Sequence, residues 1–446
     1  MPGQNFVPHI FFGLDPIWVS VAILFVTYAA IISDKLNRAI VALLGAAAAV
    51  LIGALDQAEA LKGIDWNTIG TLAGMMIMMS IARRSGVFQY LAIWAAQRAR
   101  ANPAALLVLL QLVTAVVSAL LNNVTTVLLM APVTLAITRE LKVPPYPFLF
   151  AEVFASNIGG TATLIGDPPN IMIGSLAGLD FNAFLVHLAP VIILVQLAQL
   201  AMTHVIWGKD MRSTADHRAR VMAMDAKAAI IDAVLLKQSV IVLGGVVFTF
   251  VIADALHLEA ATIAMAGAAM LMLLDNWQHH NEKQSENVHR TFSDIEWITI
   301  FFFVGLFIVV HAVEASGLLA LLASKLAAAT GGDLATTGYA ILWASAFLSA
   351  LIDNIPFVAT MIPLIKSMAP AYGGADKIEP LWWCLALGAC LGGNGTLIGA
   401  SANLTIAGIA ERNGVPFGFI KFLLYALPMM IVSIAICHLY VWWRYF

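Results

Sequence analysis

The sequence predicts an all-α integral membrane protein, an inverted-repeat fold with about 10 spanning helices, two re-entrant hairpins and two broken helices. Hydrophobic residues make up 61% of its 446 residues and charged residues only 11%, whereas soluble proteins carry about 25% charged residues. Short motifs of the first half recur in the same order in the second half. In both halves, asparagines and glycines interrupt apolar runs at matching positions. Together these three observations define the fold class.

Long uncharged runs indicate the membrane spans. Residues 181–207 and 422–443 contain no Asp, Glu, Lys or Arg, and a span needs about 20 apolar residues. Shorter uncharged runs can also span if their end residues reach the membrane surface. These shorter runs are 16–33, 39–55, 104–121 and 334–352.

The two halves of the chain are predicted to be homologous repeats. Ile64-Asp65-Trp66 recurs as Ile295-Glu296-Trp297, and Asn122-Asn123 recurs as Asp353-Asn354, both at a spacing of 231 residues. The pattern Thr-Leu-Ile-Gly-x-x-x-Asn occurs at 163–170 and again at 396–403. Several matches in order at nearly one spacing indicate a duplication.

Each repeat is expected to contain one hairpin and one broken helix. The first repeat is residues 1–207, with its hairpin near 104–138 and its break near 157–170. A linker, 208–237, joins it to the second repeat, 238–446, with a hairpin near 334–365 and a break near 392–403. The hairpin arms could instead be full spans joined by a two-residue turn. Basic residues on both sides of the first hairpin favour the re-entrant form.

The basic residues predict the orientation. If the hairpins re-enter and the broken helices cross, each half crosses an odd number of times, so the halves are inverted. Only five of the 23 basic residues then lie outside: Lys62, Lys325, Lys366, Lys377 and Arg444. The other eighteen lie in the cytoplasm, as does the linker, which agrees with the positive-inside rule. We expect a multi-pass protein of the bacterial inner membrane with both termini outside and the first span as its targeting signal.

Several classes of function are excluded or disfavoured. A net charge of −3 gives no basis for nucleic-acid binding. The three cysteines lie in apolar context and indicate no disulfide framework. We find no cluster of metal ligands and no nucleophile–base pair, so we expect neither an enzyme nor a metal or cofactor site.

The broken helices predict where the chemistry lies. An unpaired backbone group costs several kcal/mol in hydrocarbon, so breaks persist where they line a protected cavity. Close helix packing by glycine is the alternative reading. The candidate substrate-binding residues are neutral and polar, with no Lys or Arg among them, which argues against a dianionic substrate. They are Asn122, Asn123, Thr126, Asn157, Thr161, Thr163, Asn170, Asn354, Asn394, Thr396, Ser401 and Asn403.

Two acids are candidates for proton or cation coupling. Asp167 aligns with Ala400 and Asp353 aligns with Asn122, so each half-site holds one carboxylate. An acid inside a membrane is costly and is a proton or cation site by default. Helix capping is the alternative for both, and for Asp167 it is favoured by the two prolines that follow.

The segment 157–170, with Asn122-Asn123 upstream, resembles the ion transporter superfamily of ArsB-type arsenite permeases, NhaD sodium/proton antiporters and the melanocyte P protein. The Gly-Asp-Pro-Pro-Asn element at 166–170 looks most like the P protein and the ArsB-type carriers. The resemblance implies a scaffold part, a transport part that holds both hairpins, homodimers and elevator-type movement. It also implies proton-coupled export of arsenite or antimonite, in some members with an ArsA-type ATPase as partner.

Three functions remain open at this stage. The first is arsenite or antimonite export in exchange for protons. Arsenous acid is a neutral, polyol-like solute near pH 7, so hydroxyls and amides suffice and thiols are not needed. The second is sodium/proton antiport with Asp167 and Asp353 as cation ligands. The third, implied by P-protein-like members, is an anion channel, which would carry current without a counter-solute.

Overall fold

The computed structural model describes residues 8, 10–33, 35–209, 211–277 and 279–446, and within them every regular element is a helix. The all-helical prediction is therefore confirmed. The first half contains α1 (Pro16–Ile32), α2 (Arg38–Leu51), α3 (Gln57–Lys62), α4 (Trp66–Arg83), α5 (Val87–Arg98), α6 (Pro103–Leu120), α7 (Asn123–Leu141), α8 (Tyr146–Thr161), α9 (Pro168–Ala177), α10 (Phe181–His187) and α11 (Ala189–Trp207).

The short α12 (Ala215–Met222) lies in the predicted linker. The second half contains α13 (Ala233–Val251), α14 (Ala253–Leu256), α15 (Ala260–Asn276), α16 (Asn281–Ser293), α17 (Trp297–Ala315), α18 (Leu318–Ala329), α19 (Leu334–Leu351), α20 (Asn354–Met368), α21 (Glu379–Gly392), α22 (Ser401–Arg412) and α23 (Phe419–Tyr445). Short 3-10 turns are η1 (Phe11–Gly13), η2 (Lys227–Ala229), η3 (Ala369–Tyr372), η4 (Ala375–Ile378) and η5 (Gly393–Gly395).

Eight of the described helices are long and apolar enough to cross a membrane, or nine if the bent pair α9 and α10 counts as one span. About 10 spans are predicted from the sequence. The predicted ten leave out the hairpin arms, and they include α1, α2 and α15 and the broken-helix segments α8 and α21, all of which have fewer than 18 residues. Four of the eight are the hairpin arms α6, α7, α19 and α20, so the re-entrant form of the hairpins stays a prediction.

Helix contacts in one half recur in the other. Helix α6 packs on α8 as α19 packs on α21, and α5 packs on α7 as α18 packs on α20. Other contacts exchange partners between the halves: α2 packs on α17 and α15 on α4, while α9 packs on α20 and α22 on α7. The motif repeat of the sequence thus corresponds to repeated packing.

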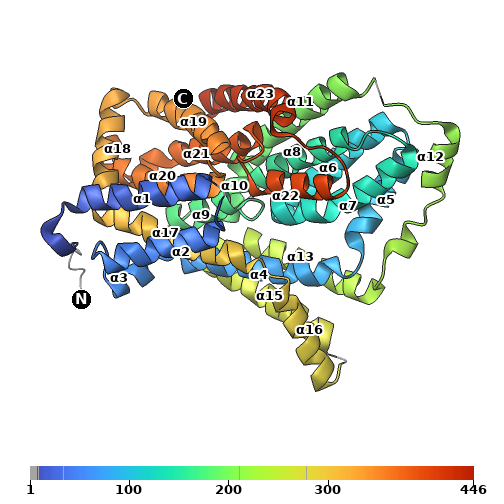
Figure 1. Ribbon diagram of the computed structural model, residues 1–446, viewed down its shortest axis with the longest axis horizontal. Helices are drawn as coiled ribbons and strands as arrows, with labels where there is room; N and C mark the ends of the chain where they lie inside the picture. The colour runs from blue at the N-terminus through green and yellow to red at the C-terminus, as the bar shows by residue number, and fades with distance from the viewer. Residues whose placement is uncertain (1–7, 9, 34, 210, 278) are drawn as a thin grey trace.

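The two hairpins approach each other from opposite ends of the molecule (Figure 1). Helices α18, α19 and α20 lie toward one end of the long axis, and α5, α7 and α12 lie toward the other. The broken helices lie between them, with α9, α10 and α22 near the middle. Residues at the hairpin tips and at the two breaks therefore meet inside the protein.

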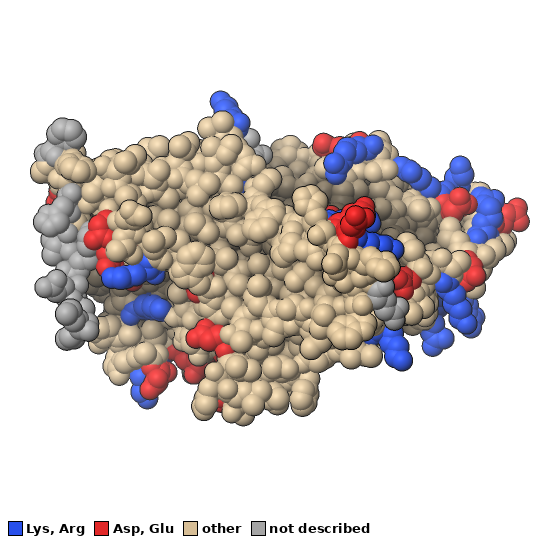
Figure 2. All heavy atoms as spheres, turned by 90° about the horizontal axis from the view of Figure 1, so that it is seen from below, with Lys and Arg blue, Asp and Glu red and all other residues tan. Residues whose placement is uncertain are grey.

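Charge is distributed unevenly along the same axis. On the face shown in Figure 2, Lys, Arg, Asp and Glu gather toward the two ends, with few charges on the band between them. Large apolar side chains such as Phe25, Phe248 and Leu424 are exposed, which suits a surface that faces lipid. The predicted outside residues Lys62 and Lys325 belong to α3 and α18, at the end opposite α12. Which end faces the cytoplasm stays a prediction, and the predicted N-terminal position falls on residues 1–7, outside the described residues.

Two glycines allow the broken helices to approach the hairpins. A Cβ on Gly159 of α8 would lie 2.1 Å from the Ala115 carbonyl oxygen of α6. A Cβ on Gly392 of α21 would lie 2.5 Å from the Ala346 carbonyl oxygen of α19. Real Cβ atoms do not come this close to backbone atoms, so both positions need glycine. The glycine-containing segments at the ends of α8 and α21 therefore provide both the close packing on the hairpins and the start of the helix breaks.

Candidate solute-binding site

A chain of asparagine amides joins the first hairpin tip to both broken helices. The side chain of Asn123 donates to Asn157 Oδ1 at 3.1 Å. In turn Asn157 Nδ2 donates to Asn394 Oδ1 at 2.8 Å and to Asn403 Oδ1 at 2.9 Å. All four side chains are at most 3% exposed. The structure thus brings these predicted residues together, from hairpin one, break one and break two.

The last asparagine of each Thr-Leu-Ile-Gly-x-x-x-Asn motif supports its own break. Asn170 Nδ2 donates to the carbonyl oxygens of Thr161 and Thr163 at 3.1 and 2.9 Å. Asn403 Nδ2 donates to those of Gly393 and Thr396, both at 2.8 Å. Carbonyls released by a helix break need such partners away from water. The first role of these two side chains is therefore to stabilise the broken backbone.

The threonine hydroxyls also bond to backbone carbonyls. Thr163 donates to the Ala119 carbonyl at 2.5 Å, and Thr396 donates to the corresponding carbonyl of Ala350. These two bonds attach each break to the last turn of its hairpin's first arm. Two further predicted threonines donate to the carbonyl one turn back in their own helices: Thr126 and Thr161.

A small inner cavity lies among several of the predicted site residues. Its volume is about 10 Å³, roughly the room that one water molecule needs. It lies where the hairpin tips face the start of α9 and α22. The residues that line it are Arg38, Asn122, Asn123, Val124, Asp167, Pro168, Glu296, Thr299, Asn354, Ile355 and Ser401.

Within the described residues, the Asp167 side chain makes no hydrogen bond. It is 1% exposed, and neither carboxylate oxygen has a partner within the described part of the chain. It precedes α9 but makes no side-chain cap, so the alternative that it serves as a helix cap is wrong. An ionised carboxylate in this position would be costly. A proton, a cation or water in the inner cavity is needed to compensate it.

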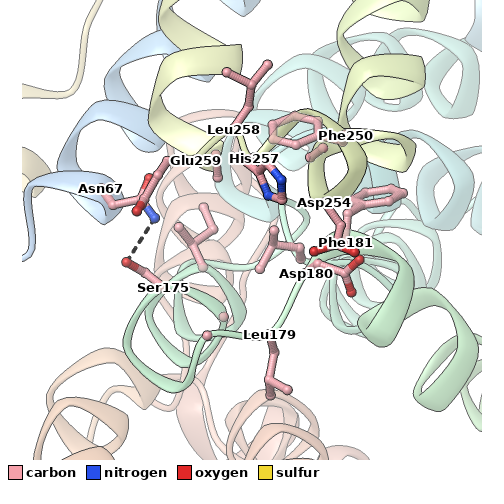
Figure 3. A pocket seen from close by; sticks show the side chains of 16 residues that line it. Asn67, Ser175, Leu179, Asp180, Phe181, Phe250, Asp254, His257, Leu258 and Glu259 are labelled. Atoms are coloured by element: carbon pink, nitrogen blue, oxygen red, sulfur yellow. Dashed lines mark hydrogen bonds between the residues drawn. The ribbon is translucent and has the colours of Figure 1, made fainter.

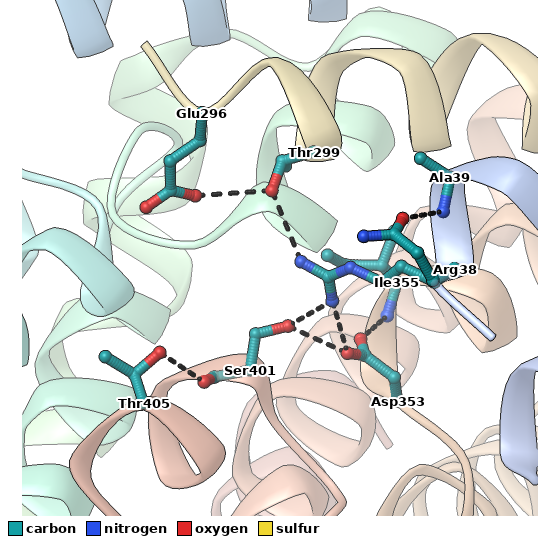
Figure 4. Close-up of polar contacts among 9 residues, drawn as sticks. Arg38, Ala39, Glu296, Thr299, Asp353, Ile355, Ser401 and Thr405 are labelled. Carbon is teal, nitrogen blue, oxygen red and sulfur yellow. Dashed lines mark hydrogen bonds and ion pairs between the residues drawn. The ribbon is translucent and has the colours of Figure 1, made fainter. Parts of the chain in front are cut away.

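Asp353 is held in a polar network with an arginine (Figure 4). Its Oδ1 accepts from the Ile355 amide at 3.1 Å, so it caps α20. Its Oδ2 accepts from Arg38 Nη1 at 3.1 Å and from the Ser401 hydroxyl at 2.8 Å. Arg38 also donates to Ser401 at 2.6 Å and to Thr299 at 3.2 Å. The expectation that no Lys or Arg lies among the site residues is therefore wrong.

Sequence reasoning missed Arg38, Thr299 and Glu296. Arg38 begins an apolar helix that Asn37 caps, and from sequence it counts only as a flanking cytoplasmic charge. Its partner Asp353 is 315 residues away along the chain. Glu296 belongs to the element Ile295-Glu296-Trp297, which matches Ile64-Asp65-Trp66 and so indicates the duplication, but the match does not show which residues Glu296 contacts. It accepts from the Thr299 hydroxyl at 3.2 Å.

Two larger cavities flank the site. One is a cleft of about 600 Å³, lined by Asn37, Arg38, Glu296, Ser401 and Thr405 among others. The second, of about 260 Å³, lies by the starts of α4 and α15 (Figure 3), where Asn67 donates to Ser175 at 3.0 Å. Acids line this second cavity, namely Asp180, Asp254 and Glu259. In the described residues, no group of three or more His, Cys, Asp or Glu is placed to hold a metal ion.

The apolar all-helical fold, the facing hairpins and the matched breaks define a membrane transporter. The chain belongs to the citrate transporter family (CitMHS), whose family model matches residues 28–388.

The relatives agree with this assignment. An uncharacterized transporter of Mycobacterium tuberculosis is 45% identical over 96% of this chain and 98% of its own length. The human P protein is 34% identical over 95% of this chain, which spans 59% of the P protein. The structure of the YdaH transporter of Alcanivorax borkumensis, titled as revealing an unusual topology, has a TM-score of 0.61 and 13% identity. That match covers 97% of this chain and 99% of YdaH, and it supports the fold alone. The resemblance to the P protein is thus confirmed, and the likeness to arsenite permeases stays a prediction.

Proposed function

We propose that this chain is a proton-coupled secondary transporter that exports a small neutral solute bearing hydroxyl groups, with arsenite or antimonite as the substrate. One observation carries the proposal. The inner cavity combines the neutral amides of Asn122, Asn123 and Asn354 with the unpartnered carboxyl group of Asp167. Amides can bond solute hydroxyls without a counter-charge, and a buried carboxyl group can exchange a proton.

The charges around the cavity argue against a tricarboxylate such as citrate, although the family is described by that substrate. Arg38 is the one cation among the cavity-lining residues, and it is paired with Asp353. Asp167 and Glu296 add acidic groups. A trianion would need a surplus of positive charge in a site of low dielectric. A neutral solute needs no such surplus.

Proton coupling is assigned to Asp167. Asp353 already has a cation, a hydroxyl and a backbone amide as partners, whereas Asp167 has none in the described residues. A carboxyl group that is protonated facing one side and deprotonated facing the other can couple proton entry to solute exit. Asp353 is accordingly the second candidate for the coupling acid.

Sodium/proton antiport is the second candidate function. The observation that favours it is the same free carboxylate beside amide oxygens, because hard cations prefer oxygen ligands. An anion channel receives less support, since the one cationic side chain at the cavity is engaged by Asp353.

Proteoliposomes containing the purified protein test these functions. An imposed pH gradient should drive arsenite to concentrate, with saturation and with exchange between labelled and unlabelled solute. Transport without any added ATPase would show that an ArsA-type partner is not required. Sodium movement in place of arsenite would favour the second function. Chloride or citrate current without a counter-solute would overturn the antiport proposal.

A further inference from the structure

The polar network around Arg38 joins two groups of helices. Arg38 and Thr299 belong to α2 and α17, which pack on each other and on α1. Asp353 is at the tip between α19 and α20, and Ser401 begins α22, which packs on α7 and α8. The bonds from Arg38 to Asp353 and Ser401 therefore cross from the α1–α2–α17 group to the second hairpin and the second break (Figure 4).

The same network stands between the outer cleft and the inner cavity. Five residues line both spaces: Arg38, Val124, Glu296, Thr299 and Ser401. On the cleft side there is about 600 Å³ of open volume, and on the inner side about 10 Å³. These shared side chains include Arg38 and Ser401, the two side chains that bond Asp353 Oδ2.

Exposure differs between the network and the inner site. Arg38 and Asp353 are partly exposed, whereas Asn354 and Asp167, which line the inner cavity, are buried at 3% and 1% exposure. Arg38 and Ser401, which bond Asp353, face both the cleft and the inner cavity.

We propose that Arg38, Asp353 and Ser401 form a gate between the cleft and the solute site, and that the gate opens by separation of the Arg38–Asp353 ion pair. The proposal rests on the proposed solute site between the hairpin tips. Separation is feasible because Arg38 lines the cleft and both side chains are partly exposed, and partly exposed ion pairs are weak. In the closed state the pair is neutral, so it presents no net charge to a neutral solute.

The fold supplies a matched control. Arg84 and Asp275 form an ion pair of 2.6 Å with side-chain exposures of 15% and 10%. This pair joins α4 to α15, two helices that pack on each other. Neither residue lines the cleft or the inner cavity.

The test uses a cysteine behind the gate. Ile355 is 3% exposed and lines the inner cavity, and the native cysteines are buried. The rate at which a membrane-impermeant methanethiosulfonate modifies Ile355→Cys is measured in the full-length protein. Each rate is corrected with the same protein lacking Ile355→Cys.

Arg38→Gln or Asp353→Asn should raise the modification rate by roughly fivefold or more, while Arg84→Gln and Asp275→Asn leave it unchanged. The exchange Arg38→Asp with Asp353→Arg should restore protection, and Arg38→Lys, which keeps the charge, should give an intermediate rate. If Arg38→Gln and Asp353→Asn do not fold, Arg38→Lys and the charge exchange remain informative, because full exposure of the cysteine in both would overturn the gate. An equal increase in the Arg84 and Asp275 variants would overturn it as well.

The readout is independent of the substrate. Faster modification of the cysteine at position 355 in the gate variants, together with no arsenite transport by the native protein, would support the gate and overturn the substrate proposal. Arsenite transport by the native protein, together with an unchanged modification rate in all gate variants, would support the substrate proposal and overturn the gate.

Discussion

The two hairpin tips share a backbone design but differ in charge. Asn122 caps α7 through its side-chain oxygen, and Asp353 caps α20 in the same way. At the second tip the acid is held by Arg38. At the first tip the cap is neutral, and the acid of that half is Asp167 on the break, whose carboxylate has no hydrogen-bond partner in the part of the chain that the structure describes.

The comparison shows that the two repeats keep the same backbone-supporting hydrogen bonds but differ in the side chains that carry charge. Ser118 donates to the Ser156 carbonyl as Ser349 donates to the Ala389 carbonyl, both at 2.7 Å. Each of these bonds attaches the first arm of a hairpin to the helix that leads into the break of the same half. The Asp353 carboxyl group is held by its partners, which suits a gate, whereas the Asp167 carboxyl group has none in the described residues, which suits proton exchange.

The largest expected effect follows from this difference. Asp167→Asn should abolish arsenite accumulation driven by a pH gradient while solute exchange persists, because the amide keeps the shape but cannot release a proton. Asp353→Asn should keep the coupling and change the rate. Proteoliposome flux with and without the gradient measures both. If Asp167→Asn still accumulated arsenite along the pH gradient and Asp353→Asn did not, the coupling acid would be Asp353.

A second difference concerns the two supporting asparagines. Asn170→Ala removes the side-chain donor from the carbonyls of Thr161 and Thr163, and Asn403→Ala removes it from those of Gly393 and Thr396. The Thr396 carbonyl keeps only a long bond of 3.3 Å from the Gly399 amide, and each buried group left unpaired costs about 1–3 kcal/mol. The loss should be larger for Asn403, whose side-chain oxygen also accepts from Asn157 at 2.9 Å, whereas Asn170 accepts from the weaker donor Cys390 at 3.4 Å. Thermal unfolding in detergent, with the exposed Gln57→Ala as control, checks the order. Equal melting temperatures for the two variants would contradict it.

The glycine pair should show a graded effect. Gly159→Ala places its Cβ nearer to a carbonyl than Gly392→Ala does, at 2.1 against 2.5 Å. Overpacking of this kind costs about 1–3 kcal/mol, so Gly159→Ala should lower the melting temperature more. Gly408→Ala in α22 is the control, since no atom lies within 4 Å of the added Cβ. A lower melting temperature for Gly392→Ala would reverse the inferred order of packing.

The smallest effect is expected for the thiols. Cys390 occupies the place that corresponds to Asn157, and its sulfur makes one weak bond to Asn170. Replacement of Cys384, Cys390 and Cys437 by alanine should leave arsenite flux within about twofold, because a weak buried donor contributes little. Selective loss of arsenite flux, with the protein still folded, would mean that a thiol binds the metalloid.

The sequence allowed the helices, the repeat spacing and the meeting of tips and breaks to be predicted, because those depend on local patterns. It could not show Arg38 beside Asp353, since that pair depends on the packing of α2 against distant helices. The hydroxyls of Thr163 and Thr396 were predicted to face solute, but their direction depends on a carbonyl in the adjacent hairpin arm. Asp167 has the sequence context of a cap, and only the folded break shows that its side chain makes no cap bond and has no other partner among the described residues.

The amide of Asn157 has a consequence for biogenesis. Its two acceptors, Asn394 and Asn403, lie 237 and 246 residues later in the chain. At a synthesis rate of about 5–20 residues per second, they leave the ribosome roughly 10 to 50 s after Asn157. During that interval the first half holds an amide donor in hydrocarbon without its final partners. The newly made first half therefore has reason to remain near the insertion machinery, or a water-filled part of it, until the second half arrives.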